Sequence, residues 1–252
     1  MQPANFDYHR ANSVDEAESL CKTNTDASFL AGGHSLIPAM KLRLSEPGAL
    51  VDIAGIDELK GIDRDGDIIR IGALTTHSEV KRSAAVNDAC SVLSETAGMI
   101  GDPQVRNRGT IGGNIAHADP ASDYPGILLA LGATIVTSSR SITVDDFFTG
   151  LFETALDEGE LIKEIQVPVL GDGSGAAYAK FFNPASRYAV VGVGAVISMD
   201  NGSCSSCRIG VTGAADHAFR ASTAEDALNG SGLGDNAIAS AAAKIADGQE
   251  ML

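Results

Sequence analysis

Two glycine pairs with small polar neighbours are the residues of this sequence best suited to bind a ligand. They lie in Ala31-Gly32-Gly33-His34-Ser35 and in Thr110-Ile111-Gly112-Gly113-Asn114. Adjacent glycines can direct successive main-chain N–H groups into one concavity, and such a concavity binds anions. Because Ser35, Thr110 and Asn114 add hydrogen-bonding groups without bulk, the two segments could together hold both phosphates of a dinucleotide.

Neither segment is one of the common nucleotide-binding motifs. No Gly-x-Gly-x-x-Gly opens a helix after the first predicted strand, and the Gly-Lys-Ser or Gly-Lys-Thr of a P-loop is missing. On the residues alone, a pair of ordinary tight turns explains the glycines as well as a ligand site does. If the turns hold a phosphate, Gly33→Val or Gly112→Val should give a folded protein without its ligand, since the new side chain would occupy the space of the phosphate.

Other polar residues indicate no second site. Cys204 and Cys207 have the spacing of a zinc-binding pair, but the second pair of a zinc ribbon is missing, so we interpret them as incidental. No two histidines have the i, i+4 spacing of a helical metal site, and no nucleophile elbow or catalytic triad is recognisable. We therefore predict no metal site and no catalytic residue. Arg106 and Arg108 fit a solvated loop as well as a contact with phosphate or a partner subunit.

The elements that must position the glycine segments alternate between helix and strand. Residues 13–16 and 76–79 are predicted capping boxes, and their helices run to about residues 22 and 83. A strand over 28–31 leads into the first glycine segment, whereas a polar loop over 101–109 leads into the second. The other predicted helices cover 87–97, 120–131, 221–228 and 236–246, and the other strands cover 50–53, 67–72, 133–137, 161–167, 177–182, 189–199 and 206–213.

These elements indicate an α/β opening segment of about 55 residues and, after a linker at 171–175, a second part in which strands come first and helices after. The 252 residues carry 33 acidic and 18 basic side chains, for a net charge of −15. A nucleic acid partner is therefore not expected, since phosphate backbones require clustered Lys and Arg.

The sequence also predicts where the protein resides. The N-terminus lacks a secretory signal pattern, and no apolar run reaches the roughly 18 residues that span a membrane. The 4 cysteines are too few for a disulfide scaffold. We expect a cytoplasmic protein without a membrane span.

The glycine segments and their surroundings resemble those of the FAD-binding medium subunits of molybdenum hydroxylases. The stretch 31–43 is similar to the first FAD motif of this family, and the stretch 104–114 is similar to the second. The stretches 184–192 and 208–213 also fit, so the resemblance covers nearly the whole chain. It is strongest to the medium subunits of aerobic carbon monoxide dehydrogenases and more distant to the FAD domain of xanthine dehydrogenase.

The resemblance implies an α+β fold of two domains. Residues 1–170 would form an FAD-binding domain of the vanillyl-alcohol-oxidase type, with subdomains of about 1–55 and 56–170. Residues 176–252 would form an α+β C-terminal domain of the carbon monoxide dehydrogenase flavoprotein type. Family members usually continue past the equivalents of Met251 and Leu252, so we expect this domain to be incomplete at its end.

The resemblance also implies which residues bind FAD. Asp123 matches the acidic FAD ligand of the family, and Lys180 matches a cation near the flavin that would favour its reduced, anionic form. Ile100 and Ile162 would touch the flavin ring, and Tyr188 would stack on it or gate it; without the resemblance, these three would be interpreted as core residues. The diphosphate and ribityl chain would lie along Phe29, Leu30, Ala31, Gly32, Gly33, His34, Ser35 and Leu36, and along Thr110, Ile111, Gly112, Gly113 and Asn114.

The function implied by the family is electron transfer through FAD. A large molybdopterin subunit would oxidise the substrate, a small subunit would carry the electrons over two [2Fe–2S] clusters, and this chain would pass them from its FAD to an external acceptor. One chain of each kind would form a trimer, and two trimers would pair. One alternative is a stand-alone FAD oxidoreductase of related fold, for which only Tyr188 offers an acid or base. A flavin-free scaffold protein is another, against which the intact glycine segments argue.

Overall fold

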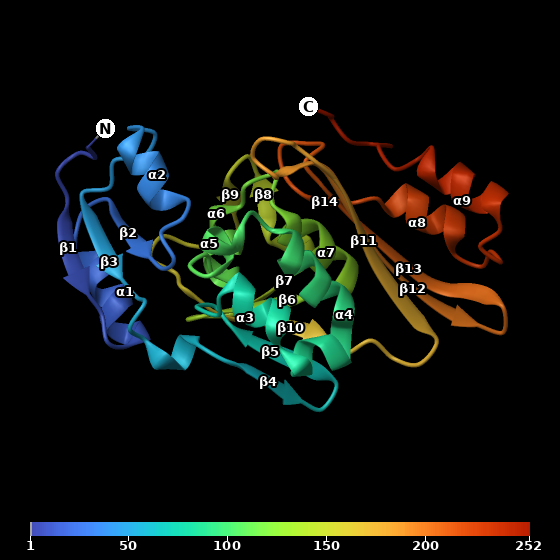
Figure 1. Ribbon diagram of the computed structural model, residues 1–252, viewed down its shortest axis with the longest axis horizontal. Helices are drawn as coiled ribbons and strands as arrows, with labels where there is room; N and C mark the ends of the chain where they lie inside the picture. The colour runs from blue at the N-terminus through green and yellow to red at the C-terminus, as the bar shows by residue number, and fades with distance from the viewer. Residues whose placement is uncertain (1) are drawn as a thin grey trace.

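The computed structural model describes residues 2–252, which form three units of secondary structure in chain order. Figure 1 shows these units side by side along the long axis of the molecule: an N-terminal sheet, a central sheet with most of the helices, and a C-terminal sheet. The mixture of helices and strands confirms the predicted α+β class. Within residues 2–252, no helix is long and apolar enough to cross a membrane.

The N-terminal unit is a parallel sheet with strand order β1-β3-β2. The helix predicted from Ser13 is confirmed, because the Glu16 N–H donates to Ser13 Oγ at 3.2 Å. The Glu16 carboxylate instead accepts from the Asn12 N–H, so the predicted capping box is only half formed. The first glycine segment connects β2 to α2. The elements of this unit are β1 (Asp7–Arg10), α1 (Val14–Thr23), β2 (Ala27–Leu30), α2 (Leu36–Lys41) and β3 (Ala49–Asp52).

The central unit is an antiparallel sheet with strand order β4-β5-β10-β6-β7. The capping box predicted at Thr76 is confirmed in both directions. The helices are α3 (His77–Arg82), α4 (Ala84–Met99), α5 (Pro103–Arg106), α6 (Ile111–His117) and α7 (Asp123–Leu131). The strands are β4 (Ile62–Asp65), β5 (Ile68–Gly72), β6 (Thr134–Thr137), β7 (Ser141–Thr143) and β10 (Ile162–Pro168), and a short hairpin is formed by β8 (Phe148–Gly150) and β9 (Glu153–Thr154).

Two predictions in the central unit are wrong at their boundaries. The loop expected over 101–109 contains α5, which Asp102 caps by accepting from the Val105 N–H at 2.9 Å. The helix expected over 120–131 begins only at Asp123.

A contact distant in sequence explains the late start of α7. Thr212 Oγ1 lies 2.7 Å from both the Pro120 and the Ser122 carbonyl oxygens, and the Gly213 N–H donates to the Pro120 carbonyl as well. The segment before α7 is therefore held against the C-terminal sheet, and this tertiary contact overrides the helix signal of Pro120.

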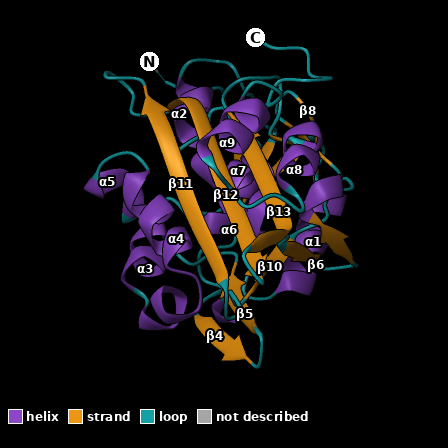
Figure 2. Cartoon of the chain, turned by 90° about the vertical axis from the view of Figure 1, so that its right-hand side faces the viewer, coloured by secondary structure: helices purple, strands orange, loops and turns teal. Residues whose placement is uncertain are grey.

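The C-terminal unit is an antiparallel sheet with strand order β11-β12-β13-β14. Figure 2 shows the long strands β11, β12 and β13 side by side, with α7 behind them. Because β11 begins at Ser174, the linker expected over 171–175 is reduced to a turn. The elements are β11 (Ser174–Phe182), β12 (Ala189–Asp200), β13 (Ser203–Thr212), β14 (Phe219–Arg220), α8 (Ser222–Leu228) and α9 (Asp235–Ala242).

Helix α7 joins the central unit to the C-terminal sheet. A Cβ added at Gly210 of β13 would overlap the Gly126 carbonyl of α7, so glycine is required for this close approach. On the same strand, Arg208 donates to the Leu129 carbonyl at 2.8 Å and to Asp145 at 2.8 Å. The position of the first residue of α7 therefore depends on the C-terminal sheet as well as on the central core.

Candidate functional site

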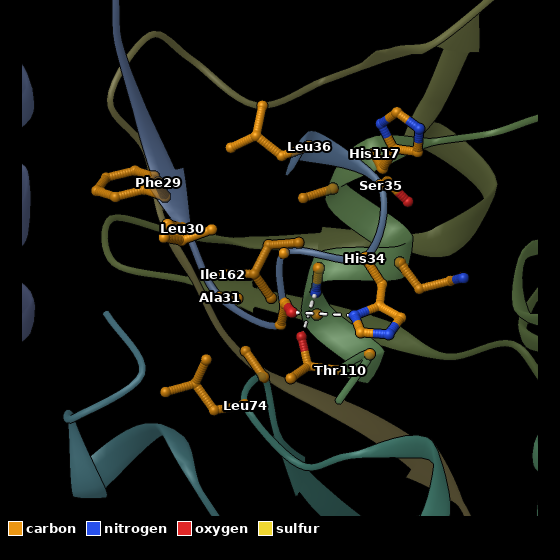
Figure 3. Close-up of a pocket in the computed structure, with 18 of the residues that line it drawn as sticks. Phe29, Leu30, Ala31, His34, Ser35, Leu36, Leu74, Thr110, His117 and Ile162 are labelled. Carbon is orange, nitrogen blue, oxygen red and sulfur yellow. Dashed lines mark hydrogen bonds between the residues drawn. The ribbon is translucent and has the colours of Figure 1, made fainter. Parts of the chain in front are cut away.

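A cavity of about 590 Å³ lies between the N-terminal and central units. Figure 3 shows its wall, with Phe29 and Leu30 from β2, Ser35 and Leu36 at the start of α2, and Thr110 at the start of α6. The C-terminal unit contributes Tyr188, whose side chain is partly exposed at 45%. Segments distant in the sequence therefore meet around one space, as the two glycine segments were predicted to do.

All of the residues predicted to bind the cofactor line this cavity except Ile111 and Lys180. The side chain of Ile111 is fully buried in the core of the central unit, beside the lining residues Thr110 and Gly112. Lys180 lies one layer behind the wall, where its ammonium contacts Asp123. The residues in place are Phe29, Leu30, Ala31, Gly32, Gly33, His34, Ser35, Leu36, Ile100, Thr110, Gly112, Gly113, Asn114, Asp123, Ile162 and Tyr188.

The first glycine segment presents a row of unused hydrogen-bond donors. Among the described residues, no protein atom accepts a hydrogen bond from the main-chain N–H of Gly32, Gly33, His34, Ser35 or Leu36. Gly33 adopts a φ of +71°, a conformation that favours glycine, and the Ser35 side chain makes no cap hydrogen bond to α2. Five successive N–H groups beside a cavity form an anion-binding surface of the kind used for phosphate.

The second glycine segment does not provide a matching row of donors. It is the first turn of α6, and its N–H groups already have partners: Ile111 donates to the Thr75 carbonyl, Gly112 to the Ala73 carbonyl, and Gly113 to Thr110 Oγ1. The expectation that both glycine pairs grip a diphosphate through their amides is therefore wrong for this half. What Thr110 and Asn114 offer to the cavity is their side chains.

The glycines of the second segment instead allow the backbone to pack closely. A Cβ at Gly112 would lie 2.5 Å from Ala73 Cβ and 2.8 Å from the Ala73 carbonyl oxygen. A Cβ at Gly32 would overlap the Arg108 carbonyl, just before the second segment. The missing side chain at Gly32 lets the first segment approach the chain just before the second, and the missing side chain at Gly112 lets α6 pack on Ala73 within the central unit.

A buried ion pair forms another part of the wall. Asp123, at the start of α7, is 4% exposed, and its Oδ2 accepts from Lys180 Nζ at 2.7 Å. Its Oδ1 accepts from the Tyr178 hydroxyl at 2.8 Å. Burial raises the pKa of Asp123, and the hydrogen bonds from Lys180 and Tyr178 oppose that rise. Because Lys180 is paired with a carboxylate, it does not present the isolated positive charge that the sequence suggested.

His77 is a buried cavity residue that sequence analysis did not assign to the site. It begins α3, its side chain is only 3% exposed, and its Nδ1 has no hydrogen-bond partner within the described residues. Burial, followed by the charges of His34 and Arg106, lowers the pKa of His77 to about 4, so the imidazole is neutral at pH 7. The capping box marked its helix, but no sequence signal marked its position in the wall.

The loop 155–161 closes the cavity beside β10, and Glu160 anchors it. The Glu160 carboxylate accepts from the Arg140 guanidinium, the Thr137 and Ser139 hydroxyls and the Asp157 N–H. Burial alone would raise the pKa of Glu160, but these donors, with Arg140 the strongest, together lower it to about 2. Sequence analysis missed this loop because its anchoring partners are distant in sequence.

These features suit an anionic cofactor with a large aromatic part. The free N–H groups can donate hydrogen bonds to a diphosphate. Apolar side chains such as Ile100, Leu74 and Ile162 can cover a ring, and Asp123 can accept a hydrogen bond from a ring N–H or a hydroxyl. Within residues 2–252, no group of three or more His, Cys, Asp or Glu side chains could hold a metal ion.

Two family models match the chain. The FAD binding domain in molybdopterin dehydrogenase matches residues 4–170, and the CO dehydrogenase flavoprotein C-terminal domain matches residues 176–251. The carbon monoxide dehydrogenase medium chain of Hydrogenophaga pseudoflava is 40% identical over 247 residues, which are 96% of this chain and 86% of that relative.

Two further proteins extend this similarity. The 6-hydroxypseudooxynicotine dehydrogenase complex subunit alpha of Paenarthrobacter nicotinovorans is 41% identical over 248 residues, 96% of this chain and 84% of the relative. A solved structure of carbon monoxide dehydrogenase from Hydrogenophaga pseudoflava, which lacks the Mo-pyranopterin moiety of its molybdenum cofactor, matches with a TM-score of 0.96 at 41% identity and covers 99% of this chain and 89% of that one.

The packing of Gly112 predicts a loss of stability on substitution. Gly112→Ala should lower the free energy of unfolding by roughly 1–3 kcal/mol, because the new Cβ meets Ala73 backbone that cannot move aside. Gly112→Val should be worse, contrary to the folded, ligand-free protein expected from the sequence. Urea unfolding measures the change. Gly175→Ala is the control, since a Cβ there has no neighbour within 4 Å. Equal stability of the two variants would contradict the packing role.

The anchor at Glu160 predicts a stability difference that depends on pH. With a folded pKa of about 2, against an ordinary value of 4.5, Glu160 stabilises the fold above about pH 4.5, and this contribution is lost as the pH falls toward 2. Glu160→Gln should cost about 1–3 kcal/mol at pH 7 and much less at pH 3. Urea unfolding at both pH values measures this, with the exposed neighbour Glu158→Gln as control. A cost that is the same at both pH values would rule out the charged anchor.

Proposed function

Because the chain belongs to the FAD-binding subunits of the molybdenum hydroxylases, we propose that it carries electrons through one FAD held in the cavity between its N-terminal and central units. The observation that carries this assignment to particular residues is the row of five free N–H groups from Gly32 to Leu36. An FAD diphosphate is the anion that such a row fits in this family.

The lining of the cavity supports an assignment of residues to each part of FAD. We propose that residues 29–36 hold the diphosphate, and that Thr110 and Asn114 bind the ribityl chain through their side chains. Asp123 would accept from the flavin, with Ile100, Ile162 and Tyr188 around the ring. When bound, FAD supplies the redox chemistry, and the chain supplies binding, orientation and exclusion of water.

The surroundings of the cavity support a carrier role. The neutral His77 and the paired Asp123 and Lys180 place little net charge at the wall, so the chain's own groups favour binding and orientation over proton transfer. A stand-alone oxidoreductase would need an acid or base poised over the ring. Tyr188 is the side chain nearest to that requirement, and burial followed by the charges of Asp119 and Asp123 raises its pKa, which makes it a poor base at neutral pH.

The partners follow from the family. We propose that the chain assembles with a large molybdopterin subunit and a small [2Fe–2S] subunit, that two such trimers pair, and that electrons reach its FAD from the iron–sulfur clusters and leave to an external acceptor. Two relatives that are almost equally identical to this chain are named for different substrates, carbon monoxide and 6-hydroxypseudooxynicotine. This supports selection of the substrate by another subunit. We place the assembly in the cytoplasm, in keeping with four free cysteines.

We propose residues 1–170 as the FAD-binding domain, with subdomains near 1–55 and 56–170, and residues 176–252 as the C-terminal domain. The sheet organisation supports this division, because the three-stranded sheet lies in the first subdomain, the five-stranded sheet lies in the second, and the four-stranded sheet follows residue 171.

The donor row predicts sensitivity to a negative charge at Ser35. Ser35→Asp places a carboxylate beside the free N–H groups, where it competes with the diphosphate and repels it. At an effective dielectric constant of about 20, one such charge pair at about 4 Å costs roughly 4 kcal/mol before screening, so we expect FAD to bind about 30- to 150-fold more weakly. Fluorescence titration with FAD measures this.

Ser35→Asn is the matched control for this experiment, because it has the same size without the charge. It should bind FAD within a few-fold of the wild type. Unchanged FAD affinity in Ser35→Asp would show that the diphosphate lies elsewhere.

The proposed assembly predicts a stable complex on co-expression. The chain, co-expressed with a large molybdopterin subunit and a small [2Fe–2S] subunit from the same organism, should elute from size-exclusion chromatography with both partners, and the flavin should be reduced when the large subunit receives its substrate. An isolated chain that binds FAD, ignores both partners and oxidises a small molecule by itself would support the stand-alone enzyme instead.

A further inference from the structure

A buried hydrogen-bond network connects the C-terminal sheet to the cavity wall. Tyr178 and Lys180 are two residues apart on β11, so both side chains point to the same face of the sheet. Tyr178 donates to Asp123 Oδ1 at 2.8 Å, and Lys180 donates to Asp123 Oδ2 at 2.7 Å. One strand therefore holds both oxygens of a carboxylate that belongs to another unit of the chain.

The strand next to β11 makes room for the Tyr178 hydroxyl. Gly192 of β12 lies beside it, and a Cβ added there would overlap the Tyr178 hydroxyl oxygen. Tyr178 is 8% exposed, so water cannot readily replace its hydrogen bond. The absent side chain at Gly192 lets the hydroxyl reach Asp123.

Two donors restrict a carboxylate more than one does. A carboxylate has about four acceptor positions, and it can rotate about its bond to Cβ when only one oxygen is held. With Oδ1 bound by Tyr178 and Oδ2 bound by Lys180, rotation of the Asp123 carboxylate would break one of two buried hydrogen bonds. The remaining acceptor positions are then fixed relative to the cavity that Asp123 lines.

We propose that Tyr178 is a positioning residue for the flavin site, which holds the Asp123 carboxylate in its ionised, cavity-facing form. This inference rests on the proposed binding of FAD in the cavity. The C-terminal sheet is then part of the cofactor site, because Tyr178 and Lys180 of β11 together fix the orientation of the Asp123 carboxylate. Lys180 alone would leave that carboxylate free to rotate.

The groups that face Asp123 determine its titration. They are the Lys180 ammonium and the Tyr178 hydroxyl from β11, and the Tyr188 phenol from the loop after β11. Of these, Lys180 and Tyr178 lower the pKa of Asp123, against the opposing effect of burial. Removing the Tyr178 hydroxyl therefore raises the pKa of Asp123 and increases its protonated fraction at the acid end of the pH range.

The test compares Tyr178→Phe with Tyr124→Phe. Tyr124 is also buried and is next to Asp123, but its hydroxyl has no hydrogen-bond partner within residues 2–252, so Tyr124→Phe controls for loss of a buried phenol. FAD dissociation constants are measured by fluorescence titration at pH 8 and pH 5. Tyr178→Phe should bind FAD about 5-fold more weakly than wild type at pH 8, and its deficit relative to wild type should be larger at pH 5, whereas Tyr124→Phe should follow the wild type at both pH values.

A double-mutant cycle separates positioning from packing. In the Asp123→Asn variant, the side chain at position 123 cannot titrate. Adding Tyr178→Phe to this variant should therefore leave the ratio of its FAD dissociation constants at the two pH values unchanged. The proposal is overturned if Tyr178→Phe matches Tyr124→Phe at both pH values, or if its loss of affinity is the same at pH 8 and pH 5. A wild-type chain that fails to bind FAD would instead refute the proposed function, so the two failures are distinguishable.

Discussion

Main-chain N–H groups that have no acceptor in the protein are the constraint around which this molecule is arranged. Five successive N–H groups beside the cavity have no acceptor in the described part of the protein, so they are available to a ligand with several acceptor atoms. The chain keeps them free by turning sharply at Gly33 between β2 and α2. A diphosphate satisfies such a row without requiring any cationic side chain.

The central unit forms the wall of the cavity opposite these free N–H groups. Gly32 lacks the side chain that would keep the N-terminal unit away from the central unit, and Gly112 lets α6 pack closely on Ala73 within the central unit. A further glycine, Gly210, lets α7 approach the C-terminal sheet, and this helix begins with Asp123. Much of the glycine in this chain therefore shapes the site indirectly, by letting layers of backbone meet, and only the first segment offers its amides to a ligand.

The sequence predicted the family, the α+β class and FAD, and the matches to family models and relatives confirm these three. Most elements were also predictable, because caps and hydrophobic periodicity are local signals. What failed depended on distant contacts: α7 begins late because Thr212 holds the carbonyls before it. Lys180 was recognised as a cation, but its pairing with Asp123 could not be read from residues so far apart in sequence.

The charge of the chain explains why neutral donors suit this site. A net charge of −15 repels a free dinucleotide at long range. Main-chain N–H groups bind phosphate oxygens by direct hydrogen bonds at short range, and these bonds depend little on the net charge of the protein. Lys180, behind the wall, is paired with Asp123, so this buried pair adds orientation without adding net charge. This acidic protein can therefore bind an anion through the local arrangement of its main-chain N–H groups. For this reason the recognisable motifs of the sequence are centred on glycines and not on basic residues.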